Sequence, residues 1–130
     1  MDWITDQIAI GNFLDAQNPP AGIDAILCLK PQCCDEARTD VSALCIALKD
    51  GAGNRREDVL EAIDFISETV TAGERVLVHC HAGRSRSVCV VAAYLMKHSG
   101  LSRSGALAII ETKREVWLSE GIDEIFGFLA

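Results

Sequence analysis

The chain has 130 residues, of which 49% are hydrophobic and 24% charged, as is ordinary for one folded domain spanning 1–130. Nineteen acidic and twelve basic residues give a formal net charge of −7, so the surface as a whole repels nucleic acid. The longest apolar run, at 88–96, is about half of a membrane span, and the N-terminus does not resemble a signal peptide. We expect a cytoplasmic monomer that binds neither nucleic acid nor membranes.

Short apolar runs indicate the strands. The runs at 8–10, 23–29 and 75–79 predict strands, the first of them at a sheet edge, and a further apolar run lies at 44–48. Residues 31–40 are polar and predict an irregular segment with a short helix.

Helical periodicity separates these runs. It predicts one helix that Asn54 caps and Gly73 ends, a second at 87–98 that is apolar almost all round, and a third after Ser102, with a short helix in 119–130. Strands that alternate with helices predict an α/β fold, with a central, mostly parallel sheet of four to five strands flanked by helices on both faces. Ligands of such sheets bind at the carboxyl ends of the strands, which here draws attention to the loop after residue 79.

Two features of composition bear on ligands. Between residues 75 and 110 there are five basic residues and no acid, which indicates a local anionic ligand if the fold gathers them, and chance if it does not. Of the six cysteines, Cys28, Cys45 and Cys89 lie in apolar contexts and are expected to be small core residues. No pair of CxxC motifs exists, so we expect no metal and no other cofactor.

The segment 79–87, HCHAGRSRS, has the residues that a phosphate site needs. Its backbone N–H groups can surround a tetrahedral anion at the start of a helix, and Gly83 allows close approach. Arg86 can bind two phosphate oxygens at once, while Cys80 lies at the end of the strand below them. The same positive environment lowers a thiol pKa and makes the cysteine a nucleophile. A buried cysteine beside an exposed helix start is the plainer alternative.

This segment resembles the HCxxGxxRS signature of the protein tyrosine phosphatase superfamily, and its AG and SRS resemble the dual-specificity branch. Similarity to that branch extends through DQIAIGNFLDA (6–16), AILCL (25–29), LKDGAGN (48–54), AIDFI (62–66) and AAYLMKHSGLS (92–102), almost the whole chain. The chain has Glu115 where the family often has proline. The resemblance implies a compact catalytic domain with that family's fold.

The resemblance also implies roles for particular residues. Cys80 would be the nucleophile that forms a phosphocysteine, and Ser87 would hydrogen-bond its sulfur. Arg86 would bind phosphate together with the backbone amides of the loop residues His81, Ala82, Gly83, Arg84, Ser85 and Arg86. His79 would order the loop, with an incidental strand-end histidine as the alternative.

Asp50 would be the general acid, because it lies on a glycine-rich loop 30 residues before Cys80, as in the family. The alternatives are that Asp50 only forms a turn, or that Glu57 or Asp58 is the acid. Three aromatic residues could lie near the mouth of this site or in the core: Trp3, Phe13 and Trp117.

The chain is therefore expected to be a cysteine-dependent phosphatase that hydrolyses phosphotyrosine and phosphoserine or phosphothreonine in proteins. Its partner would be a phosphorylated protein or a small phosphoester. One alternative is a phosphatase of a non-protein substrate such as a phosphoinositide. The others are a sulfurtransferase with a reactive loop cysteine, and an inactive module that binds phosphoproteins.

Overall fold

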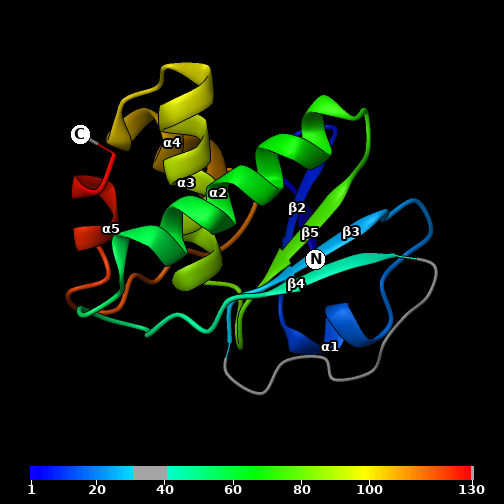
Figure 1. Ribbon diagram of the computed structural model, residues 1–130, viewed down its shortest axis with the longest axis horizontal. Coiled ribbons are helices and arrows are strands. Elements are labelled where there is room, and N and C mark those ends of the chain that lie inside the picture. The colour runs from blue at the N-terminus through cyan, green and yellow to red at the C-terminus, as the bar shows by residue number, and fades with distance from the viewer. Residues whose placement is uncertain (31–40, 130) are drawn as a thin grey trace.

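The computed structural model describes residues 1–30 and 41–129 (Figure 1). The short helix expected within 31–40 lies outside these residues. Within them, five strands form one sheet in the order β1-β2-β5-β3-β4. The strands are β1 (Asp2–Trp3), β2 (Ile8–Gly11), β3 (Ala25–Cys28), β4 (Ser42–Cys45) and β5 (Val76–His79). Only β1 runs antiparallel to its neighbour, so the predicted mostly parallel sheet is confirmed.

The central strand β5 positions the loop that follows it. Every residue of β2, β3 and β5 is buried, because these strands have neighbours on both sides and helices above and below. In register, His79 lies between Gly11 of β2 and Cys28 of β3. The chain therefore leaves β5 at the carboxyl edge of the sheet, between two other strand ends.

The prediction that 8–10 is an edge strand is wrong. The two-residue strand β1 pairs with β2 and covers its outer side, so that β1 and β4 are the edges. Such a short strand carries no periodicity that a sequence could reveal. Cys45 on β4 is likewise not a core residue, because it is exposed and disulfide-bonded, whereas Cys28 and Cys89 are buried as expected.

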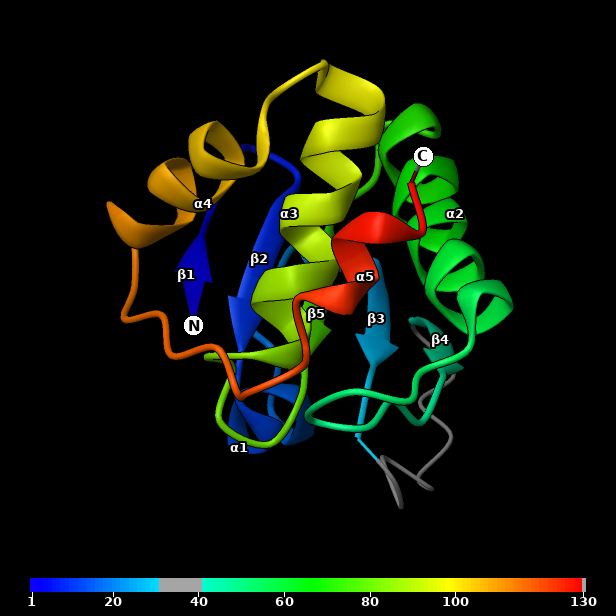
Figure 2. The same cartoon turned by 90° about the vertical axis from the view of Figure 1, so that its left-hand side faces the viewer.

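The helices cover both faces of the sheet (Figures 1 and 2). Helix α1 (Phe13–Gln17) lies on one face, above a small cluster that includes Ala9 and Leu77. The other face carries α2 (Arg56–Thr71), α3 (Arg86–Ser99), α4 (Arg103–Glu111) and α5 (Glu124–Gly127) around the larger core. Helix α3 is buried along residues 87–95, as its apolar surface predicts, and it ends at Gly100 in the left-handed conformation.

Asn54 is not the N-cap of α2, contrary to prediction. Arg55 occupies that position and makes no side-chain cap hydrogen bond. The Asn54 carboxamide instead turns back into the preceding loop, where it accepts a hydrogen bond from Lys49 N–H at 2.7 Å. Ser102 does cap α4, by accepting a hydrogen bond from Gly105 N–H at 3.0 Å.

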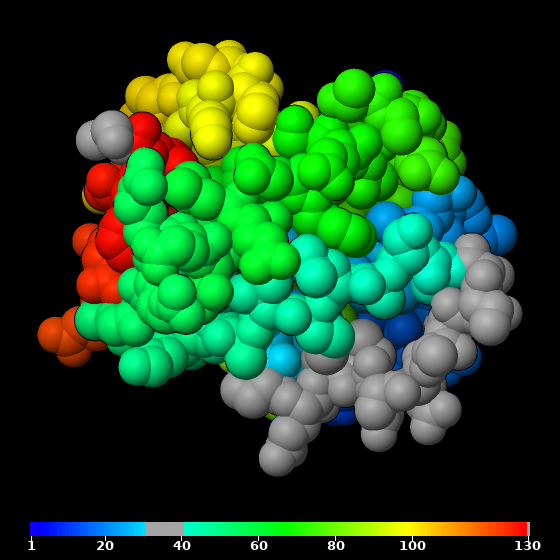
Figure 3. Space-filling view, viewed as in Figure 1, coloured from blue at the N-terminus to red at the C-terminus, as the bar shows by residue number. Residues whose placement is uncertain are grey.

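Helix α2 also carries much of the negative charge. Its side chains form a broad part of the face shown in Figure 3, and its exposed acids are Glu57, Glu61, Asp64 and Glu68. Among the described residues no helix combines the length and the apolar character needed to span a membrane.

Candidate active site

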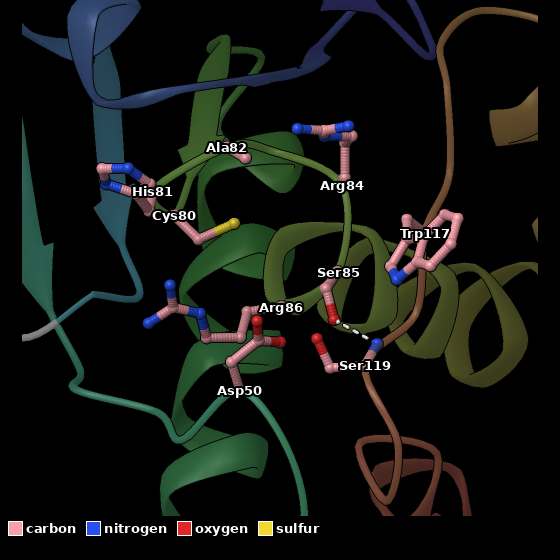
Figure 4. Close-up of a pocket in the computed structure, with 9 residues that line it drawn as sticks. All are labelled: Asp50, Cys80, His81, Ala82, Arg84, Ser85, Arg86, Trp117 and Ser119. Atoms are coloured by element: carbon pink, nitrogen blue, oxygen red, sulfur yellow. Dashed lines mark hydrogen bonds between the residues drawn. The ribbon is translucent and has the colours of Figure 1, made fainter.

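A cavity of about 600 Å³ opens at the carboxyl edge of the sheet, where β5 ends (Figure 4). Its lining comes from the loop after β5, the loop after β4 and the segment before α5. The lining residues are Asp50, Cys80, His81, Ala82, Arg84, Ser85, Arg86, Trp117 and Ser119. The structure thus places seven of the predicted site residues around one cavity, and the remaining three, His79, Gly83 and Ser87, are buried in or beside the same loop.

Cys80 lies at the bottom of this loop and is 2% exposed. Its sulfur is 3.3 Å from the Gly83 backbone nitrogen, which donates to it, and 3.2 Å from Ser87 Oγ. Burial raises the pKa of the Cys80 thiol, but hydrogen bonds from Ser87 and Gly83 and the charge of Arg86 outweigh it and hold the pKa below its ordinary value. A thiolate is the form of cysteine that attacks phosphorus.

Gly83 is required by the way the loop packs. Its φ is +72°, and a side chain there would place Cβ 2.5 Å from the Gly11 carbonyl oxygen and 2.8 Å from Arg114 Nη2. The Arg114 guanidinium, which sequence reasoning did not single out, lies behind the loop and donates hydrogen bonds to Ile10 O and to Asp2 Oδ2. Arg114 therefore links the end of β2 with Asp2 of β1 behind the loop.

Arg86 is the first residue of α3, so its side chain extends from the N-terminus of the helix. Its Nη1 donates to Leu48 O at 3.3 Å. Its Nε is buried and has no hydrogen-bond partner within residues 1–30 and 41–129. A buried donor without a partner costs free energy unless a ligand satisfies it, and an oxyanion in the cavity would do so.

His79 supports the loop backbone. Its Nδ1 lies 3.3 Å from Cys80 O, a contact in which the ring N–H donates to the carbonyl. Burial lowers the pKa of His79, and this effect exceeds the opposing hydrogen bond with Cys80 O, so the imidazole is neutral at physiological pH. Its Nε2 is buried without a partner in the described part of the chain.

Asp50 reaches the cavity from the opposite side, on an exposed loop. Figure 4 shows its carboxylate beside Arg86, facing the space below Cys80. Within the loop, the Asn54 side chain accepts from Lys49 N–H and donates to Lys49 O at 3.0 Å and to Gly51 O at 3.2 Å. These three bonds close the loop into a compact turn.

A residue far along the chain holds this turn in place. Glu124 Oε1 of α5 accepts hydrogen bonds from Gly53 N–H at 2.5 Å and Asn54 N–H at 3.0 Å. The turn before α5 also packs against the loop, because a side chain at Gly121 would meet the Ala52 backbone nitrogen at 2.9 Å. Nothing in the sequence around Glu124 signals this contact, since it joins residues about 70 positions apart.

The segment before α5 also contacts the loop after β5. Trp117 N–H donates to Arg84 O at 2.9 Å, and Ser119 N–H donates to Ser85 Oγ at 3.0 Å (Figure 4). Arg84 forms an ion pair with Glu115 at 3.0 Å. One segment thus contacts both of the loops that line the cavity.

The basic residues of 75–110 are only partly gathered. Arg84 and Arg86 line the cavity, whereas Arg75 lies over the Trp3 ring and Arg103 over the Phe126 ring. Among the described residues, no group of three or more His, Cys, Asp and Glu side chains is arranged to hold a metal ion.

Comparisons with known proteins identify the family of the chain. The family model for the dual specificity phosphatase catalytic domain matches residues 10–126. The chain is 34% identical over 122 residues to dual specificity protein phosphatase 22-A of Danio rerio, which covers 88% of this chain and 57% of that protein. It is 50% identical over 56 residues to dual specificity protein phosphatase 1 of Arabidopsis thaliana, or 43% of this chain and 28% of that protein.

The fold is shared as well. The crystal structure of Tk-PTP in its active form matches with a TM-score of 0.83 and 26% identity, over 98% of this chain and 93% of that one. The α/β sheet and the loop after β5 define a domain of the protein tyrosine phosphatase type. Within that type, the chain belongs to the dual specificity phosphatase catalytic-domain family. It spans less than two thirds of the length of the curated relatives just named.

Proposed function

We propose that this domain hydrolyses phosphomonoesters, namely phosphotyrosine and phosphoserine or phosphothreonine in proteins, through a phosphocysteine on Cys80. The observation that carries the proposal is one cavity with a thiol of lowered pKa, a buried Arg86 Nε that has no partner among the described residues, and an Asp50 carboxylate. These are a nucleophile, an anion-binding group and a group able to move a proton.

In the first step the Cys80 thiolate attacks phosphorus, and a sulfur–phosphorus bond forms as the bond to the ester oxygen breaks. Asp50, in its protonated form, gives its proton to the leaving oxygen. The loop amides and the Arg86 guanidinium stabilise the charge on the three remaining phosphoryl oxygens. His79 keeps the Cys80 carbonyl, and with it the loop backbone, in place.

In the second step water attacks the phosphocysteine. The Asp50 carboxylate takes a proton from that water, the sulfur–phosphorus bond breaks and orthophosphate leaves. Ser87 Oγ, 3.2 Å from the sulfur, stabilises the departing thiolate. The enzyme returns to its starting state, and no redox change occurs.

The test is phosphate release by the wild type and by Cys80→Ser, measured on phosphotyrosine and phosphoserine peptides. A serine hydroxyl stays protonated near neutral pH, so we expect a loss on the order of 10⁶-fold, as for other catalytic nucleophiles. Inorganic phosphate should still bind, because the amides and Arg86 remain. Turnover by the serine variant within about tenfold of wild type would refute the covalent mechanism.

Three further measurements separate the alternatives. A phosphatase of small phosphoesters would have a higher kcat/KM on a phosphoinositide than on either peptide. Sulfur transfer from thiosulfate to cyanide would identify a sulfurtransferase, and phosphopeptide binding without turnover would identify a binding module.

A further inference from the structure

Trp117 is the most exposed large apolar side chain among the described residues, at 71%. The other two, Leu14 and Ile109, do not line the cavity, whereas Trp117 does. Isolated apolar residues are normal on a protein surface, so exposure alone carries no meaning. The place of Trp117 at the mouth of the cavity is what distinguishes it.

The backbone of Trp117 is fixed to the loop that surrounds Cys80. Its N–H donates to Arg84 O at 2.9 Å, and two residues later Ser119 N–H donates to Ser85 Oγ at 3.0 Å. The backbone that carries the indole is therefore fixed to the loop. Because it is already ordered, it loses little conformational entropy when a ligand packs against the indole. Figure 4 shows the indole projecting at the edge of the cavity, away from Asp50 and Arg86.

The opposite side of the mouth has a different character. There His81 stacks on Phe13, with ring centroids 4.9 Å apart and planes 9° apart, and Lys30 lies 5.8 Å from the Phe13 ring. The two faces that meet in this stack are covered, and the Lys30 cation lies beside Phe13. Among the described residues no ring or cation packs on Trp117, so both faces of its indole are available to a substrate.

We infer that Trp117 is a specificity-determining residue that packs against the organic group carrying the phosphate and favours aryl phosphates over alkyl ones. The inference rests on the proposed function, since it presupposes that the phosphoryl group lies above Cys80. An aromatic ring offers a flat apolar face for stacking, whereas a serine side chain adds a single methylene. The substrate class it points to is phosphotyrosine.

The test compares Trp117→Ala and Trp117→Phe with wild type on two peptides that differ only in phosphotyrosine or phosphoserine. For Trp117→Ala we expect kcat/KM on the phosphotyrosine peptide to fall about 3- to 10-fold, mainly through KM, the size of one aromatic contact. The phosphoserine peptide should change less than twofold, and Phe should restore most of the loss. Ile109→Ala, an exposed apolar residue away from the cavity, is the matched control.

An equal change on both peptides, or no change on either, would overturn the inference. Inorganic phosphate should inhibit Trp117→Ala as it inhibits wild type, which shows that the loop is intact. If Trp117→Ala does not fold, Trp117→Leu repeats the comparison with an apolar side chain that lacks the ring.

A binding measurement separates the two proposals. In a Cys80→Ser background, calorimetry should show phenyl phosphate bound about 3- to 10-fold more tightly with Trp117 than with Ala, and inorganic phosphate bound equally. If wild type lacks turnover but this difference in binding is found, the proposed function fails and the role of Trp117 stands. If turnover depends on Cys80 but the difference is absent, Trp117 has no such role.

Discussion

The loop at 80–86 and the loop at 49–54 line the same cavity but are held in different ways. In the first, Gly83 and Ser87 hydrogen-bond the Cys80 sulfur from three and seven residues away, and all three residues are buried. In the second, Asp50 is exposed, and Glu124 holds the loop from a distant part of the chain. The properties of the proposed nucleophile, Cys80, are thus built locally, whereas the position of the proposed acid, Asp50, depends on tertiary contacts.

This difference predicts that the two loops will fail differently when altered. Changes in the first loop should alter the chemistry of the sulfur and phosphate with every substrate. Changes in the second should matter in proportion to how much the leaving group needs a proton. The following variants test that division, from the largest expected effect to the smallest.

Asp50→Asn should lower kcat on phosphotyrosine by about 10²–10⁴-fold, the usual contribution of general acid–base catalysis. An activated aryl phosphate should suffer less, because its leaving oxygen needs no proton. An equal loss on phosphotyrosine and on the activated aryl phosphate would mean that Asp50 only shapes its loop, and would direct attention to Glu57 and Asp58.

Arg86→Lys should lower kcat/KM by about 10²–10³-fold on every phosphomonoester. Lysine keeps the charge but lacks the planar pair of donors, and it cannot place a buried Nε where Arg86 has one. Steady-state kinetics on phosphotyrosine and on the activated ester should show the same loss. A lysine variant with near-normal kcat/KM would remove Arg86 from the site.

Glu124→Ala should release the Asp50 loop, because two backbone N–H groups lose their acceptor. We expect kcat on phosphotyrosine to fall about 3- to 10-fold, since freeing this exposed loop costs about the net energy of one ordinary hydrogen bond, with little change on the activated ester. Glu124→Gln keeps an acceptor oxygen and should recover most of the activity, and Glu120→Ala, an exposed neighbour, is the control. Equal losses on both substrates would show a general loss of structure instead.

Ser87→Ala should raise the pKa of Cys80, because it removes the hydroxyl that hydrogen-bonds the sulfur. Below the ordinary thiol pKa, a higher Cys80 pKa means less thiolate, so alkylation by iodoacetate should slow, and its pH midpoint should move upward. The midpoint in Asp50→Asn, whose change lies in the other loop, should stay close to wild type. An unchanged midpoint in Ser87→Ala would exclude the hydroxyl as a source of thiolate stability.

The same division explains what the sequence could predict. Cys80, Arg86 and the glycine between them act over a few residues, so their spacing predicts that they belong to one loop. Asn54 has the pattern of an N-cap, yet its carboxamide bonds Lys49 and leaves Arg55 as the cap. The Asn54 side chain could either cap the helix or close the loop, and packing decides which, here the contact of the loop with Glu124.

Other features depend on how distant segments meet. The two residues of β1 are too few for any periodicity, so the sequence predicts β2 as an edge strand. Trp117 could have been core or surface, and its place at the mouth follows from the hydrogen bond of its backbone with Arg84. Arg114 lies behind the loop and donates hydrogen bonds to Ile10 and Asp2, which are about a hundred residues away in the sequence.

The central claim, a covalent phosphoryl group on Cys80, is tested most directly by trapping it. In Asp50→Asn, an activated aryl phosphate should still phosphorylate the sulfur, whereas hydrolysis lacks its base, so the intermediate accumulates. Acid quenching and peptide mass spectrometry should then find one added phosphoryl group on the peptide that contains Cys80, and none in the Cys80→Ser protein. Release of the aryl group with no phosphoryl group on Cys80, or with one on another residue, would contradict the account.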